Sequence, residues 1–375
     1  TLNVVDLLVD DDLTVTDDMT VGGTLGVTGI ATFTDDIIIG DGKTIGSASD
    51  VDAITIASNG QVTLTQTLIG TALDISGDID VDGTTNLDAV DVDGAANFAA
   101  DVTFAVGADI ITASGGTGNL RLGEDAGDAV TGNFNVLVGK DSGTALEGAA
   151  GNVGLGYRTL YTSVAGDYNT AIGREALLTN NVSGNNYNTA VGAFAGKLVT
   201  TGTQNTLIGG LAGDALTAAF ENVAIGYEAQ TTDTLGRRTV AVGNGALQSQ
   251  NFTSATNTYN VAVGYDAGTL VTTGTENTLI GGIAGDALTD ADGNTAVGYS
   301  SLTSDTLGSK STAIGRSALA TQNFTSATDS NNTAVGYQAG VAVTTGTHDT
   351  LIGALAGASN TTGGDNVALG SVSLS

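Results

Sequence analysis

The stretch NTLIGG at residues 205–210 recurs as NTLIGG at 277–282 and as DTLIGA at 349–354, so the three copies are equally spaced. Between the first two copies a shorter unit, N-[T/V]-[A/L]-[V/I/L]-G-x-x-A, places its Gly at positions 209, 226, 243, 264 and 281. Three of these four intervals are equal and one is longer, and together they form a 72-residue super-repeat of mostly 17-residue units. Repeats this short cannot bury an apolar face alone, so the units must stack on one another.

Each unit predicts one short strand in a coil of a β-solenoid. The residue before the Gly is aliphatic, and the residue two positions earlier is mostly Thr or Val, so both lie on one face of the strand. The residue between them is usually Ala or Leu. A strand that is apolar on both faces is normally covered on both. We expect the Ala/Leu side to face outward, where Ala permits the close approach of another copy of the chain.

We expect structural roles for the Asn and the Gly of the unit. Stacked strands about 4.8 Å apart bring equivalent Asn side chains into register as an amide ladder. The Gly suits a corner with positive φ or a tight backbone approach. Fourteen intervals at that rise predict a rod of roughly 67 Å rather than a pocket. Representative positions of the repeat are Asn205, Gly209, Asn277, Gly281, Asn294 and Gly298.

The chain is predicted to have three zones. Residues 1–45 run largely in hexads such as LLVDDD, LTVTDD and MTVGGT, with apolar first and third positions, which are typical of brief strands around a β-helical shaft. Residues 46–114 form an irregular, Asp-rich β shaft, and residues 115–375 form the stacked coils. The predicted fold class is all-β, an elongated repeat β-solenoid or β-helix.

The composition of the 375 residues agrees with a β architecture and excludes several classes. Pro, Cys and Trp are absent, while Gly occurs 56 times. A continuous strand ladder excludes Pro, and a chain without Cys has no disulfide or thiolate metal site. The net charge of −30 disfavours nucleic acid and anionic membranes as partners. Since no apolar run reaches about 18–20 residues, we expect no membrane insertion.

Four stretches carry a resemblance to known fibres: NTAIGREAL (169–177), NTAVGAFAG (188–196), NVAVGYDAG (260–268) and NTAVGYQAG (332–340). They resemble the head repeats of trimeric autotransporter adhesins, and more closely the repeat arrays in long tail fibres of bacteriophages. The hexads are similar to shaft repeats of such fibres. The resemblance implies a parallel homotrimeric β fibre that presents receptor contacts. Adhesin heads use shorter coils than these, so the phage fibre is the preferred interpretation.

The predicted function is therefore that of a non-enzymatic attachment fibre, a phage tail fibre that mediates recognition of the host surface. Its expected partners are two further copies of itself, the virion or other fibre components, and a host cell-surface glycan or protein. The expected location is the virion surface or the extracellular space. The alternatives are a bacterial extracellular adhesin, a self-assembling surface filament, and a fibre-borne polysaccharide depolymerase. Acidic residues are too numerous for a glycosidase-type pair to be singled out.

Polar insertions supply the candidate receptor contacts. They occur at QSQNFTSATNTYN (248–260) and ATQNFTSATDSNN (320–332), and in shorter form at LLTNNVSGNNYN (177–188). We expect these loops to protrude from one edge of the stack, either as receptor contacts or as excursions that brace the shaft. Five tyrosines directly follow a coil Gly, and we expect them to pack as a ladder: Tyr157, Tyr227, Tyr265, Tyr299 and Tyr337. The aromatic side chains proposed to stack on sugars are Tyr187, Phe252, Tyr259 and Phe324.

A candidate structural Ca²⁺ site lies in the sequence Asp78-x-Asp80-x-Asp82-Gly83, which matches the first half of a calcium loop. The match ends there, because Ala89 stands where a bidentate Glu is required. Strand alternation, with the three Asp pointing outward, explains the pattern equally. No other cofactor is expected. His348 occupies a variable turn of the super-repeat, so no catalytic role is predicted for it.

Overall fold

The computed structural model describes residues 6–34, 37–40, 43–47, 50–65 and 115–375. These residues contain no helix, and their regular structure is entirely β. The chain divides into two units, residues 1–100 and residues 101–375, each of which is described by itself.

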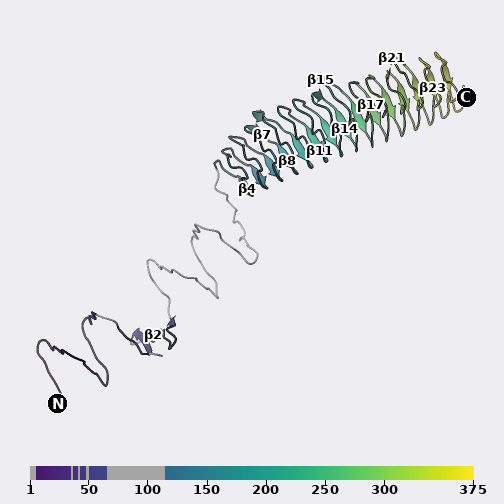
Figure 1. Ribbon diagram of the computed structural model, residues 1–375. Helices are drawn as coiled ribbons and strands as arrows, with labels where there is room; N and C mark the ends of the chain where they lie inside the picture. The colour runs from purple at the N-terminus through teal and green to yellow at the C-terminus, as the bar shows by residue number, and fades with distance from the viewer. Residues whose placement is uncertain (1–5, 35–36, 41–42, 48–49, 66–114) are drawn as a thin grey trace. The chain divides into compact units, whose positions relative to one another are not determined.

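Residues 115–375 form a stack of coils, and each coil contributes one three-residue strand to a single parallel sheet of 15 strands (Figure 1). Sequential strands are neighbours in the sheet, with register such as Leu207 opposite Ala224. The predicted β-solenoid is therefore confirmed. Its strands are β4 (Leu120–Leu122), β5 (Val136–Val138), β6 (Val153–Leu155), β8 (Thr170–Ile172), β10 (Thr189–Val191), β11 (Thr206–Ile208), β12 (Val223–Ile225), β14 (Val240–Val242), β16 (Val261–Val263), β17 (Thr278–Ile280), β18 (Thr295–Val297), β20 (Thr312–Ile314), β22 (Thr333–Val335), β23 (Thr350–Ile352) and β24 (Val367–Leu369).

Each of the three longer coils contributes one strand to a small parallel sheet of two strands. The other strand of each pair comes from the coil before it. In each pair the second strand lies in a lengthened coil, directly before the next strand of the main sheet. The insertions therefore leave the register of the main sheet unchanged. The pairs are β7 (Gly166–Asp167) with β9 (Gly184–Asn185), β13 (Gly236–Arg237) with β15 (Thr256–Asn257), and β19 (Gly308–Ser309) with β21 (Thr328–Asp329).

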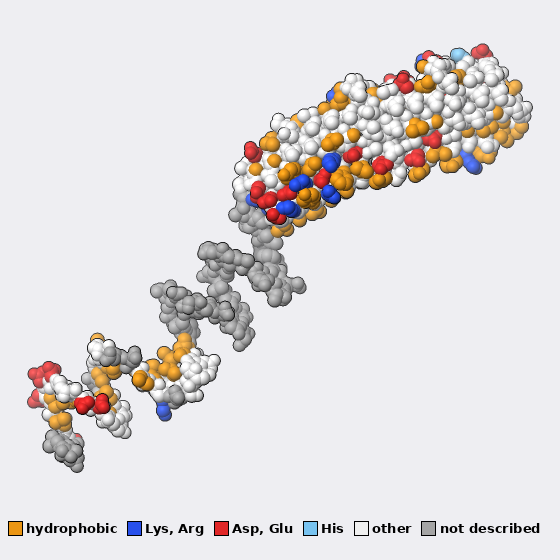
Figure 2. All heavy atoms as spheres, viewed as in Figure 1, with side chains coloured by type: hydrophobic (Ala, Val, Ile, Leu, Met, Phe, Trp, Pro, Cys, Tyr) orange, Lys and Arg blue, Asp and Glu red, His pale blue; other side chains and the backbone are white. Residues whose placement is uncertain are grey.

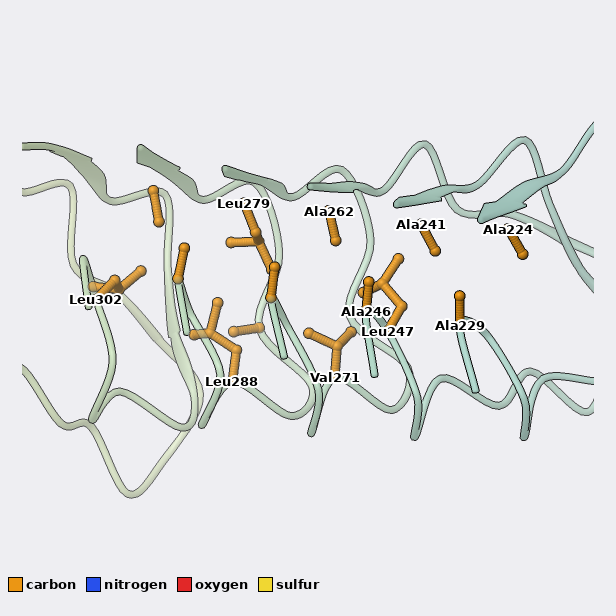
Figure 3. Close-up of a cluster of buried hydrophobic side chains, with 14 of the residues drawn as sticks. Ala224, Ala229, Ala241, Ala246, Leu247, Ala262, Val271, Leu279, Leu288 and Leu302 are labelled. Carbon is orange, nitrogen blue, oxygen red and sulfur yellow. The ribbon is translucent and has the colours of Figure 1, made fainter. Parts of the chain in front are cut away.

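The Ala/Leu side of the main sheet faces the interior of the coils, which corrects the expectation that it faces outward. Leu207 and Ala224 are fully buried, whereas Thr206 and Ile208 on either side of Leu207 are at the surface. Figure 3 shows Ala224, Ala241, Ala262 and Leu279 pointing from their strands into the core. The physical reason is space, because the narrow interior of so short a coil admits Ala in most coils and Leu only at intervals. The bulkier β-branched residues lie outside.

The hexads of residues 6–34 contain bends but no strand in the single chain, so the short strands expected there stay a prediction for the assembled fibre. Their apolar side chains are at the surface: Leu13, Met19 and Leu25 are each more than half exposed. A strand needs a neighbour to pair its backbone groups. The described hexads have no such neighbour within one chain.

A three-stranded antiparallel sheet follows the hexads, in the order β1 (Lys43–Ser47), β2 (Asp50–Ile56) and β3 (Val62–Leu64). The turn between β2 and β3 carries Asn59 and Gly60, with Gly60 at φ +82°. Its backbone is closed by a hydrogen bond from Ala57 N to Gln61 O of 2.8 Å. This hairpin was not predicted, although an Asn-Gly pair between segments of alternating apolar residues is a strong hairpin signal.

Candidate interaction surfaces

The predicted Asn ladder is confirmed by hydrogen bonds between successive coils. Asn205 donates its backbone N–H to Oδ1 of Asn188 at 3.0 Å and its side-chain Nδ2 to the carbonyl of Ala219 at 3.0 Å. Its own Oδ1 accepts the N–H of Asn222 at 3.1 Å. Asn205 is fully buried and links three successive coils. Asp349 takes the same place and accepts the N–H of Asn366 at 2.9 Å.

The coil glycines are confirmed as corners with positive φ. Gly209 and Gly281 have φ of +134° and +133°. A Cβ added to Gly281 would lie 2.6 Å from the backbone of Gly298 in the next coil, which is closer than any real contact. The glycines are therefore required both by their φ and by the close stacking of adjacent coils.

The outer face of the main sheet is an apolar surface that nothing in the described residues covers. In coil after coil it presents Thr or Val at the first strand position and Val, Ile or Leu at the third. Side chains such as Ile208, Val263, Ile280 and Ile314 are exposed. Contiguous exposed apolar surface of this kind usually marks a place where another molecule binds.

The four candidate receptor contacts divide into two exposed and two buried side chains. Tyr187 and Tyr259 are about half exposed. Tyr187 stacks on Tyr168, with ring centroids 5.4 Å apart, and the Tyr259 hydroxyl accepts a hydrogen bond from Arg238 at 3.1 Å. Phe252 and Phe324 are only 6% exposed. The expectation that the aromatic residues protrude is therefore wrong for these two phenylalanines.

Two buried carboxylates explain why the phenylalanines turn inward. Oδ1 of Asp233 accepts the backbone N–H of Phe252 at 3.1 Å and of Gly236 at 3.0 Å, and Oδ2 accepts Nε2 of Gln250 at 2.6 Å. Asp305 holds Phe324 in the same way. Sequence reasoning missed this anchor. Its signal was an Asp and a Gln one coil apart in both copies of the super-repeat, Asp233 with Gln250 and Asp305 with Gln322.

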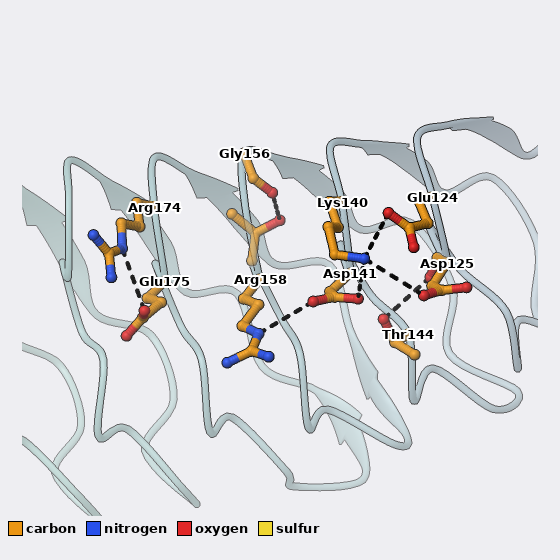
Figure 4. A network of polar contacts seen from close by, with 10 residues as sticks. Glu124, Asp125, Lys140, Asp141, Thr144, Gly156, Arg158, Arg174 and Glu175 are labelled. Atoms are coloured by element: carbon orange, nitrogen blue, oxygen red, sulfur yellow. Dashed lines mark hydrogen bonds and ion pairs between the residues drawn. The ribbon is translucent and has the colours of Figure 1, made fainter.

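A band of ion pairs crosses the first coils of the stack (Figure 4). The Nζ atom of Lys140 lies 2.7 Å from Oε2 of Glu124. The Nζ atom of Lys197 lies 2.8 Å from Oε2 of Glu175. The hydrogen bond and charge of Lys197 lower the pKa of Glu175, and the hydrogen bond to Glu124 raises the pKa of Lys140. Pairs at the surface contribute little to stability. They do neutralise the cations, so these lysines do not form a basic patch.

The five tyrosines that follow a coil Gly do not form the expected packing ladder. They are partly or well exposed, and no two of their rings stack; the stacked ring pair among the described residues is Tyr168 with Tyr187. Figure 2 shows apolar and charged side chains gathered together along one edge of the coil stack.

The candidate calcium residues Asp78, Asp80 and Asp82 lie outside the described residues. Within the described residues, no group of three or more His, Cys, Asp or Glu side chains is arranged to hold a metal ion. The same residues contain no helix able to cross a membrane. A hollow of about 300 Å³ opens at the last coil, and no titratable side chain lines it.

Comparison with known proteins gives no match: no protein-family model, curated protein or solved structure is significantly similar to this chain. The function is therefore inferred from the geometry of its surfaces.

Proposed function

We propose that the chain is the rod of an attachment fibre, in which three parallel copies bind side by side and hold a recognition surface away from the particle or cell that carries it. A phage tail fibre is the form of this proposal that the repeat motifs favour. The rod has a mechanical and presenting role and no catalytic one. The observation that carries the proposal is the uncovered apolar outer face of the 15-stranded sheet.

The outer face is suited to bind copies of itself. It is formed by the same positions in every coil, so two parallel chains present matching rows of side chains at the same spacing along the rod. Thr, Val and Ile are neutral, so contact there avoids bringing together the acidic residues that give each chain a charge of −30. Closed symmetric assemblies of identical chains are the usual outcome of such a surface.

The exposed hexads support the same arrangement independently. Leu7, Leu13, Met19 and Leu25 recur at the first position of successive hexads and are uncovered in the single chain. Two further copies would supply both apolar cover and the missing strand neighbours.

The test is the solution mass of the full chain by light scattering. Three copies of 36.9 kDa give about 111 kDa, and we expect one sharp species of that mass. Ile280→Lys places a charge in the centre of the outer face and should produce monomers that keep the β circular-dichroism spectrum. Ser326→Lys adds the same charge to an exposed loop and should leave the mass unchanged.

A monomeric wild-type chain would contradict the proposal. Open-ended polymers whose length grows with concentration would instead favour the second candidate, a self-assembling surface filament. An Ile280→Lys chain that remains trimeric would show that the copies meet elsewhere.

A further inference from the structure

Four tyrosines occupy equivalent positions on alternate coils. Tyr227, Tyr265, Tyr299 and Tyr337 each lie two residues after a strand of the main sheet, namely β12, β16, β18 and β22. In the sheet order, one strand separates each from the next, β14, β17 and β20 in turn. Since neighbouring strands lie about 4.8 Å apart, the tyrosines recur about every 9.6 Å and span roughly 29 Å. Their exposures are between 47% and 61%.

The residues beside these tyrosines leave each ring about half exposed. Gly210 precedes Tyr227 and Gly282 precedes Tyr299 along the row, and a Cβ at either glycine would lie 3.4 or 3.5 Å from the following ring. Each of these rings therefore lies against the backbone of the coil before it. Arg316 lies between Tyr299 and Tyr337, 5.9 and 6.0 Å from the two ring centres. Arg316 therefore packs beside both rings, and Tyr299 and Tyr337 remain about half exposed.

We propose that this tyrosine row binds an extended, neutral, β-1,4-linked glycan, with one tyrosine under every second sugar. Such glycans are nearly straight and repeat every two sugars, at a distance close to the spacing of the tyrosines. The apolar face of a sugar ring packs on an aromatic ring, whose size and rigidity make it a good contact surface. A row of evenly spaced aromatic rings fits a repeating polymer better than it fits an irregular protein surface.

The polar groups beside the row are consistent with a neutral sugar chain. The hydroxyls of Tyr227 and Tyr265 hydrogen-bond to the carboxylates of Glu228 and Asp266, and this raises the pKa of both tyrosines. These carboxylates can also accept hydrogen bonds from sugar hydroxyls. With a net charge of −30, the chain disfavours an anionic polysaccharide.

This inference rests on the proposed function, because it names the class of surface to which the fibre attaches. It is tested by calorimetric titration of the full chain with cello-oligosaccharides and N-acetyl-chito-oligosaccharides of two, four, six and eight sugars. Affinity for one series should rise with length and level off near the span of four tyrosines. Maltohexaose, which is α-linked and curved, and polygalacturonate, which is anionic, should bind far more weakly.

Matched variants locate the site. Tyr265→Ala and Tyr299→Ala should each weaken binding of the eight-sugar ligand by about tenfold, comparable to the loss of one stacking platform elsewhere. Tyr265→Phe keeps the ring and should bind nearly as well as the wild type. Phe134→Ala removes an exposed aromatic ring outside the row and should have no effect.

Light scattering on every variant separates this inference from the proposed function. A trimeric wild type that binds neither glycan series, or whose Tyr265→Ala variant binds unchanged, would overturn the inference and leave the fibre intact. If Tyr265→Ala alters the mass, the row is a contact between copies and the inference fails. If the chain is monomeric and shows the expected glycan binding, the inference stands and the proposed trimer is wrong.

Discussion

Single residues matter most where they link coils, and the Asn ladder is the strongest such link. Asn277 is fully buried among backbone groups of its neighbours. It donates to Oδ1 of Asn260 and to the carbonyl of Ala291, and accepts the N–H of Asn294. A buried polar group left without a partner costs about 1–3 kcal/mol.

Asn277→Ala is therefore expected to destabilise the coils by about 2–4 kcal/mol, because it orphans the Ala291 carbonyl and the Asn294 N–H. The measurement is the urea midpoint followed by circular dichroism, together with amide exchange at Asn294. Asn257→Ala, at an exposed position of β15, is the control and should change stability by less than about 0.5 kcal/mol. Equal effects of the two substitutions would show that the ladder is not needed for stability.

A second prediction at this scale concerns pH. Burial raises the pKa of Asp286, and the nearby charge of Asp266 acts in the same direction, while the hydroxyl of Thr303 opposes it. A carboxyl whose pKa is higher in the folded state contributes stability that is fully present below its unfolded pKa. That contribution is lost as the pH rises through the raised folded value. At neutral pH, ionised Asp286 therefore destabilises the fold.

Asp286→Asn should accordingly raise the thermal unfolding midpoint at pH 7 and have little effect near pH 3.5, since Asn keeps the oxygen that Thr303 contacts. Asp290→Asn is the matched control, because Asp290 is exposed and its loss removes the same overall charge. A gain at pH 7 of the same size in both variants would assign the effect to general charge repulsion.

Within the coils, the four-coil super-repeat is a pattern of large and small side chains at the core positions. In the coil of β17, Leu279 and Leu288 fill the core and residue 285 is Gly, whose added Cβ would lie 2.8 Å from both leucines. In the next coil Ala296 leaves space, and Leu302 fills it from the position equivalent to Gly285. Gly268, in the coil before, also faces Leu279. Each Leu on a strand thus requires Gly in its own coil and in the preceding one.

The expected result is a coupling between Leu279 and Gly285. Leu279→Ala should destabilise the protein by about 2–5 kcal/mol through the cavity it leaves. Gly285→Ala overpacks the wild-type core, but in the Leu279→Ala background one of its two clashes is gone. A double-mutant cycle by urea unfolding should therefore give a favourable coupling of about 1 kcal/mol. If the effects of the two substitutions on the free energy of unfolding are additive, the core does not depend on the pairing of Leu279 with Gly285.

The same pattern explains what could and could not be predicted from sequence. The spacing of Asn and Gly was enough to predict the coils, the ladder and the parallel order of strands, because each follows from the period alone. The inward direction of Ala and Leu was missed, since it depends on how much space a closed coil leaves. Leu160, Tyr168 and Leu247 have positive φ, which their residue types do not suggest. These strained positions are held by bonds between coils, such as Leu247 N to Ala267 O at 3.1 Å.

The candidate surface residues also divide into those whose exposure the sequence predicts and those whose burial depends on another coil. The exposure of Tyr187 and Tyr259 agreed with their place in polar insertions, but Phe252 and Phe324 are held inward by carboxylates of the preceding coil. A contact that depends on a partner in another coil is invisible to local patterns. The alternation of the tyrosine row follows from the coil period in the sequence, but the exposure of its rings does not.

When whole chains assemble, the repulsion between their negative charges opposes the burial of their apolar outer faces. Each chain carries a net charge of −30, so bringing three copies together has an electrostatic cost that acts against burial of the outer faces. Salt screens that repulsion, with a Debye length of about 30 Å at 0.01 M and about 8 Å at 0.15 M. Burial of apolar surface is not weakened by salt in this range.

The assembled fraction should therefore rise as NaCl is increased from about 0.01 M to 0.5 M, because the repulsion between copies is screened over shorter distances. Sedimentation velocity at a fixed low protein concentration measures it directly. Comparison of NaCl with CaCl₂ at equal ionic strength separates screening from coordination, and a larger effect of Ca²⁺ would support a site at Asp78, Asp80 and Asp82. Dissociation on adding salt would mean that ion pairs, rather than the apolar outer face, hold the copies together.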